Sequence, residues 1–191
     1  MRGGHIGGVR LYVSFWFLAG LALFTLLDHS FLVPPFLCVI ALHEGAHLAA
    51  MALFGAHIRA VELRLYGARI DADLSALSCR ERAAVYLCAP VCNLILGSAA
   101  LLIDASSAFG VFQLGVGLFQ LAPIPPLDGG NAVREIFTSP GAARVLRWAA
   151  VLTLAAVGAA ACVLCAVYQN FTLLVCAVYL AVMLAGEGKG K

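Results

Sequence analysis

The sequence has little charge. Only 12% of its 191 residues are Asp, Glu, Lys or Arg, whereas 63% are hydrophobic, and the mean hydropathy is +0.98. A soluble domain of this length needs more polar residues than this to cover its surface. The composition therefore excludes an ordinary soluble globule and predicts an integral membrane protein.

Clusters of basic and aromatic residues are also lacking, and the net charge is only +2, so we expect no nucleic-acid partner. The seven cysteines are an odd number, and most of them lie in apolar stretches, where they are expected to pack as small apolar side chains. Cys162 and Cys165 have the spacing of a redox or zinc pair. Their apolar surroundings and the lack of a second pair nearby favour packing.

Apolar stretches of roughly the length that crosses a bilayer occur six times. They predict an all-α, polytopic membrane protein with six transmembrane helices, at residues 11–27, 31–54, 83–103, 109–122, 149–168 and 171–184. The fourth and sixth are short for a span and depend on their neighbours. We find no internal repeat and no linker to a second soluble domain, so we expect one domain over residues 1–191.

The distribution of basic residues predicts the orientation. If the N-terminus is cytoplasmic, all 12 Lys and Arg residues fall on cytoplasmic segments, and the turns at 28–30, 104–107 and 169–170 contain none. We expect both termini on the cytoplasmic side of a bacterial cell membrane. The alternative for the first apolar run is a cleaved signal peptide, although the run is long for one.

The segment His43-Glu44-Gly45-Ala46-His47 carries the clearest chemical signal. Two histidines four residues apart project from one helix face and can bind a single zinc ion, and the intervening glutamate can reach water as a general base. These ionisable residues lie near the middle of an expected span, where an unpartnered charge is costly. The alternative is that they hydrogen-bond to each other between helices. His5, His29 and His57 have no partner at ligand spacing.

A catalytic zinc site needs a third protein ligand, and Asp128 is the leading candidate. It follows three prolines and precedes two glycines in the stretch Pro123-Ile124-Pro125-Pro126-Leu127-Asp128-Gly129-Gly130. Irregular backbone at membrane depth indicates a lined cavity. The alternative is that Asp128 only caps a following helix.

Two further features have a structural and a functional interpretation. Asn93, close to Pro90 and Gly97 in an apolar stretch, could donate a hydrogen bond to a substrate carbonyl or its oxyanion, or could join two helices. The alternation in residues 58–72 predicts a short β-hairpin at the cytoplasmic membrane surface. Its free edge could accept an extended peptide as an added strand, or the hairpin could be a mere connector.

These segments together resemble the site-2 protease family of intramembrane zinc metalloproteases, through His-Glu-Gly-Ala-His, Ala-Pro-Val-Cys-Asn-Leu and Pro-Pro-Leu-Asp-Gly-Gly in that order. The resemblance covers about residues 31–131, and the six-span plan is similar to the sporulation-protease branch. It implies that His43, His47 and Asp128 bind zinc and that Glu44 activates water. Many relatives carry a CBS or PDZ domain. We expect neither in this sequence, so their regulation is not carried over.

The expected function is therefore hydrolysis of peptide bonds in transmembrane or membrane-proximal segments of substrate proteins. The expected partners are such substrates and the lipid bilayer. A non-catalytic membrane protein that binds metal or serves as a scaffold is the alternative. A metal carrier has no use for Glu44, and the sequence lacks the paired interrupted helices of a repeat-built transporter.

Overall fold

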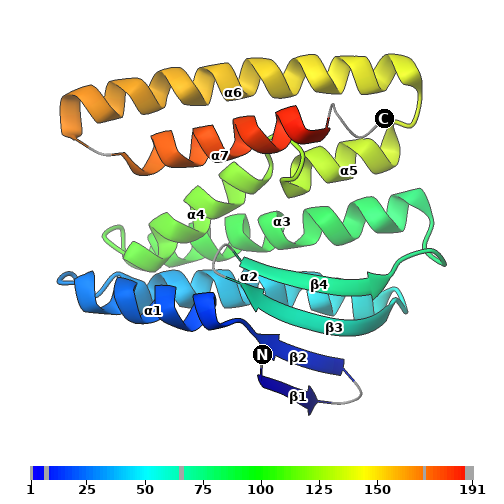
Figure 1. Cartoon of the computed structure of the whole chain (residues 1–191), viewed down its shortest axis with the longest axis horizontal. Coiled ribbons are helices and arrows are strands. Elements are labelled where there is room, and N and C mark those ends of the chain that lie inside the picture. The colour runs from blue at the N-terminus through cyan, green and yellow to red at the C-terminus, as the bar shows by residue number, and fades with distance from the viewer. Residues whose placement is uncertain (1, 7–8, 65–66, 170, 188–191) are drawn as a thin grey trace. The chain divides into compact units, whose positions relative to one another are not determined.

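A computed structural model describes residues 2–6, 9–64, 67–169 and 171–187 of the chain (Figure 1). These residues form four strands and seven helices. The chain divides into two compact units, Met1–Gly117 and Leu118–Lys191. The first unit contains all four strands, and the second contains the last three helices.

The strands of the first unit form one mixed sheet in the order β1-β2-β3-β4. The strands are β1 (Arg2–Ile6), β2 (Val9–Val13), β3 (His57–Arg64) and β4 (Gly67–Asp73). β2 and β3 pair in parallel, whereas β1–β2 and β3–β4 are antiparallel pairs (Figure 1). The hairpin predicted at 58–72 is therefore confirmed as β3–β4, with β4 at the edge of the sheet.

The all-α expectation needs a correction, because β1 and β2 extend the hairpin into a four-stranded sheet. Leu11 and Val13 of β2 run directly into the apolar residues of the first helix, so the sequence merges a strand and a helix into one apolar stretch. The helix α1 (Phe15–Leu27) begins only after Ser14, whose hydroxyl accepts a hydrogen bond from the Phe17 amide at 3.1 Å. The protein is mostly helical, with a small mixed sheet.

The helix that carries the histidines, α2 (Val33–Leu53), has well-defined ends. Two prolines occupy its first turn, where a backbone N–H would have no acceptor within the helix, so their missing N–H groups cost no hydrogen bond. The Asp28 carboxylate accepts hydrogen bonds from the amides of Leu32 at 3.0 Å and Val33 at 2.7 Å, which would otherwise be unsatisfied. Gly55, at φ 75°, follows the last turn and lets the chain reverse into β3.

Glycines bring the next two helices close together in the first unit. These are α3 (Cys79–Ile103) and α4 (Ala108–Gln120), which continues into the second unit. A Cβ atom at Gly97 would lie 2.9 Å from the backbone nitrogen of Leu114, and one at Gly117 would lie 3.0 Å from the Pro90 carbonyl oxygen. Close approach through small residues is typical of helix pairs in membranes.

The second unit contains α5 (Asp128–Ile136), α6 (Pro140–Tyr168) and α7 (Thr172–Glu187). α6 and α7 lie side by side (Figure 1). Ile124 and Leu127, from the proline-rich segment before α5, are buried with Ala150 of α6 and Leu180 of α7. This apolar cluster anchors the irregular segment that leads into Asp128.

Three helices, α2, α3 and α6, are long and apolar enough to cross a membrane, so the chain is a multi-pass membrane protein. Each of the six predicted stretches is helical over most of its length. However, α1 and α4, like the 173–186 part of α7, are shorter apolar helices. Six spans therefore stay a prediction, as does a single domain.

The two glycines after Asp128 are required by packing. A Cβ atom at Gly129 would lie 2.2 Å from the carbonyl oxygen of Leu121, and one at Gly130 would lie 2.4 Å from the Pro125 nitrogen. These contacts are to backbone, which cannot rotate away. The segment 121–125 therefore packs directly on the first turn of α5.

We predict that Gly129→Ala lowers the free energy of unfolding by about 1–3 kcal/mol, because the added methyl group displaces this segment. The matched control is Gly158→Ala in α6, where an added Cβ atom meets nothing within 4 Å. It should be neutral or stabilising by up to about 1 kcal/mol. Denaturant unfolding of both variants in detergent micelles measures the difference, and equal stabilities would contradict the packing argument.

Candidate functional site

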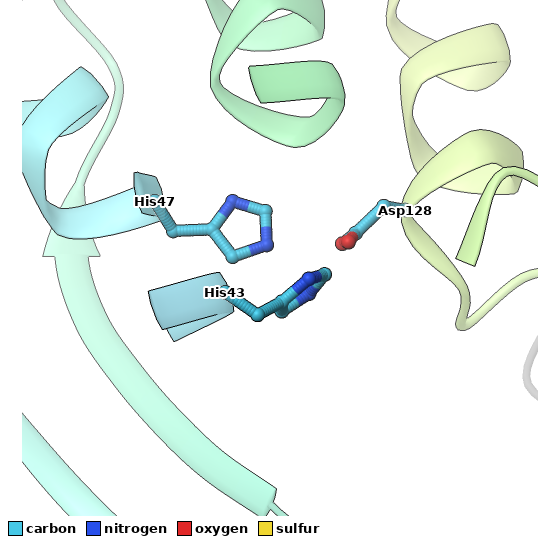
Figure 2. Close-up of side chains that lie close together, drawn as sticks. All are labelled: His43, His47 and Asp128. Carbon is cyan, nitrogen blue, oxygen red and sulfur yellow. The ribbon is translucent and has the colours of Figure 1, made fainter. Parts of the chain in front are cut away.

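The two histidines of α2 lie together on its buried face. His43 is 4% exposed and His47 is 8% exposed. Their ring centroids are 4.9 Å apart, with 89° between the ring planes, and both rings leave the same side of the helix (Figure 2). The four-residue spacing therefore gives the arrangement predicted from the sequence, in which two imidazoles can bind one ion.

A hydrogen bond to α3 sets the protonation of His47. Its Nδ1 lies 2.8 Å from the backbone carbonyl oxygen of Val85. Because a carbonyl oxygen can only accept, Nδ1 must carry the proton and donate it, which leaves the lone pair on Nε2. Histidines that bind metals usually donate their second ring nitrogen in this way. The His47 ring is thus prepared to act as a ligand through Nε2.

Cys88 is a neighbour of His47 that the sequence did not single out. Its thiol lies 3.1 Å from the Val85 carbonyl oxygen, 3.3 Å from that of Ala46, and 4.0 Å from His47 Nδ1. The single S–H can donate to either carbonyl oxygen, one on each helix, and the sulfur lies beside the ring. Its position supports the role of a packing residue expected for the cysteines in apolar stretches.

Glu44 follows His43 directly on α2 and, unlike the two histidines, lines a cavity. It is half-buried and lines an apolar cavity of about 490 Å³ between α1, α2 and the ends of β3 and β4. A Cβ atom at Gly67, the first residue of β4, would lie 4.0 Å from Glu44 Oε1, so the carboxylate is next to the edge strand. Glu44 therefore combines access to a cavity with closeness to a peptide edge.

The cavity has a second charged residue, Arg64 of β3. Its guanidinium donates a hydrogen bond to Glu62 and thereby holds the pKa of Glu62 below its ordinary value. Glu62 and Arg64 are consequently an ion pair at neutral pH. The rings of Phe36 and Phe112 also line the cavity and meet edge to face with centroids 5.5 Å apart.

Asp128 belongs to the second unit, where it is the first residue of α5 (Figure 2). Its exposed fraction is 9%. Leu127 occupies the N-cap position, so Asp128 is not the capping residue that the alternative interpretation required. The preceding turn is held by hydrogen bonds from Leu127 N to Ile124 O at 2.7 Å and from Asn131 Nδ2 to Pro126 O at 3.0 Å. The irregular backbone predicted before Asp128 is confirmed.

Asn93 is fully buried on α3, and its Cβ atom would lie 3.1 Å from a Cβ atom at Gly117 of α4. Among the described residues, neither atom of its amide group has a hydrogen-bond partner. Gln113 of α4 is also fully buried, and its amide likewise lacks a partner in the described part of the chain. Sequence reasoning missed Gln113, although glutamines inside an apolar stretch, here Gln113 and Gln120, are themselves a signal of function.

The remaining histidines and the cysteine pair lie outside this site. His29 and His57 are exposed, and the side chain of His5 is outside the described residues. Cys162 and Cys165 are free cysteines on α6. Imidazole nitrogens and a carboxylate oxygen, the donors of His43, His47 and Asp128, are the set that zinc accepts in hydrolytic sites.

Comparison with known proteins gives a match among the solved structures. No family model and no curated protein matches the chain. A solved structure, the site-2 protease from Methanocaldococcus jannaschii, is similar with a TM-score of 0.66 at 16% identity, and the match covers 100% of this chain and 96% of that one. At this identity the likeness shows the fold alone. The chain has a site-2 protease-like fold, whereas the sporulation branch stays a prediction.

We predict that His43→Asn and His47→Asn each lower the affinity for zinc at least about tenfold, because each removes one ligand atom. Zinc bound to the purified protein, measured by inductively coupled plasma mass spectrometry at set free zinc, tests this. His57→Asn is the matched control, since His57 is exposed at the start of β3. Unchanged zinc content in either site variant would exclude that histidine as a ligand.

Proposed function

We propose that the chain is an intramembrane zinc metalloprotease that hydrolyses peptide bonds in transmembrane or membrane-proximal segments of substrate proteins. The single observation that carries the proposal is the buried His43–His47 pair with its prepared His47 tautomer and with Glu44 beside it. The site-2 protease-like fold, which extends over the whole chain, supports the proposal further.

The proposed zinc ligands are His43, His47 and Asp128. Each of the three side chains offers one ligand atom, an imidazole nitrogen or a carboxylate oxygen. Three protein ligands leave one coordination position open for chemistry, as catalytic zinc sites require. Zinc bound there would supply Lewis acidity, which acidifies water and polarises a substrate carbonyl.

Glu44 is the proposed general base. Its carboxylate takes a proton from the attacking water while the water oxygen bonds to the carbonyl carbon of the scissile peptide. The same carboxylate then delivers that proton to the amide nitrogen as the carbon–nitrogen bond breaks. The products are a free carboxylate and a free amine, and Glu44 returns to its starting state.

The cavity beside Glu44 suggests how a substrate segment is held. Its apolar wall, formed by α1 and α2, suits the side chains of a membrane segment. β4 is the edge strand, so a locally unwound segment can pair with it and keep its carbonyl groups accessible near Glu44. Unwinding is needed because carbonyl groups in a helix are engaged in hydrogen bonds.

Asn93 is the proposed hydrogen-bond donor to the substrate. It would stabilise the negative charge that develops on the substrate carbonyl oxygen, as a neutral donor in a water-poor site. With the N-terminus in the cytoplasm, every Lys and Arg would lie on that side, and the active site would open toward it. A bacterial cell membrane fits this arrangement of charges.

We predict that Glu44→Gln lowers the rate of cleavage by roughly 10²–10⁴-fold and leaves zinc content unchanged, because the amide cannot take a proton but is not a ligand. The assay uses fluorescently labelled single-span transmembrane segments in detergent micelles. Cleavage by Glu44→Gln at the wild-type rate would disprove the mechanism. Stoichiometric zinc without any cleavage by the wild type would instead favour the non-catalytic alternative.

The substitution Asp128→Asn tests whether Asp128 is a zinc ligand or only stabilises the fold. The amide is a poorer zinc ligand, so we predict at least about tenfold lower zinc affinity with little change in the unfolding midpoint measured without zinc. Asp71→Asn, at an exposed position of β4, is the matched control. Retained zinc in Asp128→Asn, or an equal loss in Asp71→Asn, would exclude Asp128 as the third ligand.

A further inference from the structure

The second unit contains a cavity of about 830 Å³ that is bounded by α5, α6, α7 and Pro125. Three arginines line it, Arg134 from α5 and Arg144 and Arg147 from α6, and none of the described residues lining it is acidic. None of the residues proposed for zinc binding or catalysis lines this cavity. The charge therefore indicates a site for an anion that is distinct from the proposed active site.

The two arginines of α6 are placed to act together. Arg144 and Arg147 are three residues apart, so they lie on one face of the helix, and both are exposed. They lie in the first turns of α6, which begins at Pro140 after the N-cap Ser139. Guanidinium groups match the oxygens of phosphate with two parallel hydrogen bonds, so this pair suits a phosphate group.

The same cavity has an apolar wall, to which Leu146, Ala150 and Leu184 contribute. Leu146 and Ala150 are buried on α6, next to the arginine face of the helix. Trp148, on the same turns of α6, is 63% exposed. Exposed tryptophans are enriched where a helix crosses the boundary between lipid headgroups and acyl chains. Trp148 therefore favours a position of the arginines at headgroup level, with the apolar wall next to them.

We propose that this cavity binds an anionic phospholipid. Arg144 and Arg147 would bind the headgroup phosphate, and an acyl chain would lie against Leu146, Ala150 and Leu184. Basic pockets between transmembrane helices bind anionic headgroups in this way. A free phosphate would use only the arginines and would leave the apolar wall uncovered, so the lining favours a lipid.

Native mass spectrometry of the purified full-length chain in detergent tests the proposal with defined probes. Phosphatidylglycerol and phosphatidylcholine with identical acyl chains are titrated separately, and inorganic phosphate in excess is added as a competitor. The variants are Arg144→Gln/Arg147→Gln and Arg144→Lys/Arg147→Lys. The matched control, Arg69→Gln/Arg80→Gln, removes two exposed arginines of the first unit that do not line the cavity.

We expect the wild type to bind phosphatidylglycerol at least about tenfold more tightly than phosphatidylcholine. The glutamine variant should lose roughly 25-fold in affinity, because each arginine near a membrane surface contributes a factor of about five. The lysine variant keeps the charge and should stay within about fivefold of the wild type, and the control within about twofold.

Equal binding of the two lipids would overturn the proposal, as would an equal loss in the control. Complete displacement of phosphatidylglycerol by inorganic phosphate would assign the cavity to free phosphate and overturn the lipid assignment. A changed elution volume and zinc content would show that the glutamine variant fails to fold. In that case the affinity of the lysine variant and the preference of the wild type between the two lipids still test the proposal.

Discussion

The cost of placing ionisable side chains in an apolar helix governs the arrangement of the first unit. α2 carries His43, Glu44 and His47 in a helix long and apolar enough to cross a membrane. A charge at the centre of such a helix costs about 3 kcal/mol on insertion scales. The buried Val85 carbonyl oxygen meets the proton of His47, and Glu44 faces a cavity that also holds Arg64. α3 therefore has to place the Val85 carbonyl oxygen beside His47, and the sheet has to place Arg64 at the cavity that Glu44 lines.

The sequence predicts those parts of the fold that depend on local pattern. The span around α2 and the β3–β4 hairpin follow from apolar length and from alternation about a glycine, and both are confirmed. β1 and β2 could not be found in this way, because the parallel pairing of β2 with β3 joins residues 50 positions apart, Arg10 and Ala60. The close packing at Gly129 is also hidden from the sequence, because it depends on the irregular path of the chain between Leu121 and Gly129.

Only those parts of the candidate site that depend on local pattern could be predicted from the sequence. Spacing along one helix gave His43, Glu44 and His47, because four residues of a helix fix which side chains share a face. The tautomer of His47 depends on a carbonyl group of another helix, and the cavity beside Glu44 depends on α1, α2, α4, β3 and β4, so neither is visible in the sequence. Asn93 faces α4 inside a glycine-rich helix contact, and its role in catalysis stays a prediction.

The central claim is that two imidazoles and a carboxylate, and no thiolate, bind one zinc ion. X-ray absorption spectroscopy at the zinc edge of the zinc-loaded protein tests it most directly. The account predicts nitrogen and oxygen neighbours at about 2.0–2.1 Å, with the scattering pattern of two imidazole rings. A sulfur neighbour at about 2.3 Å, or the pattern of fewer than two imidazoles, would contradict it.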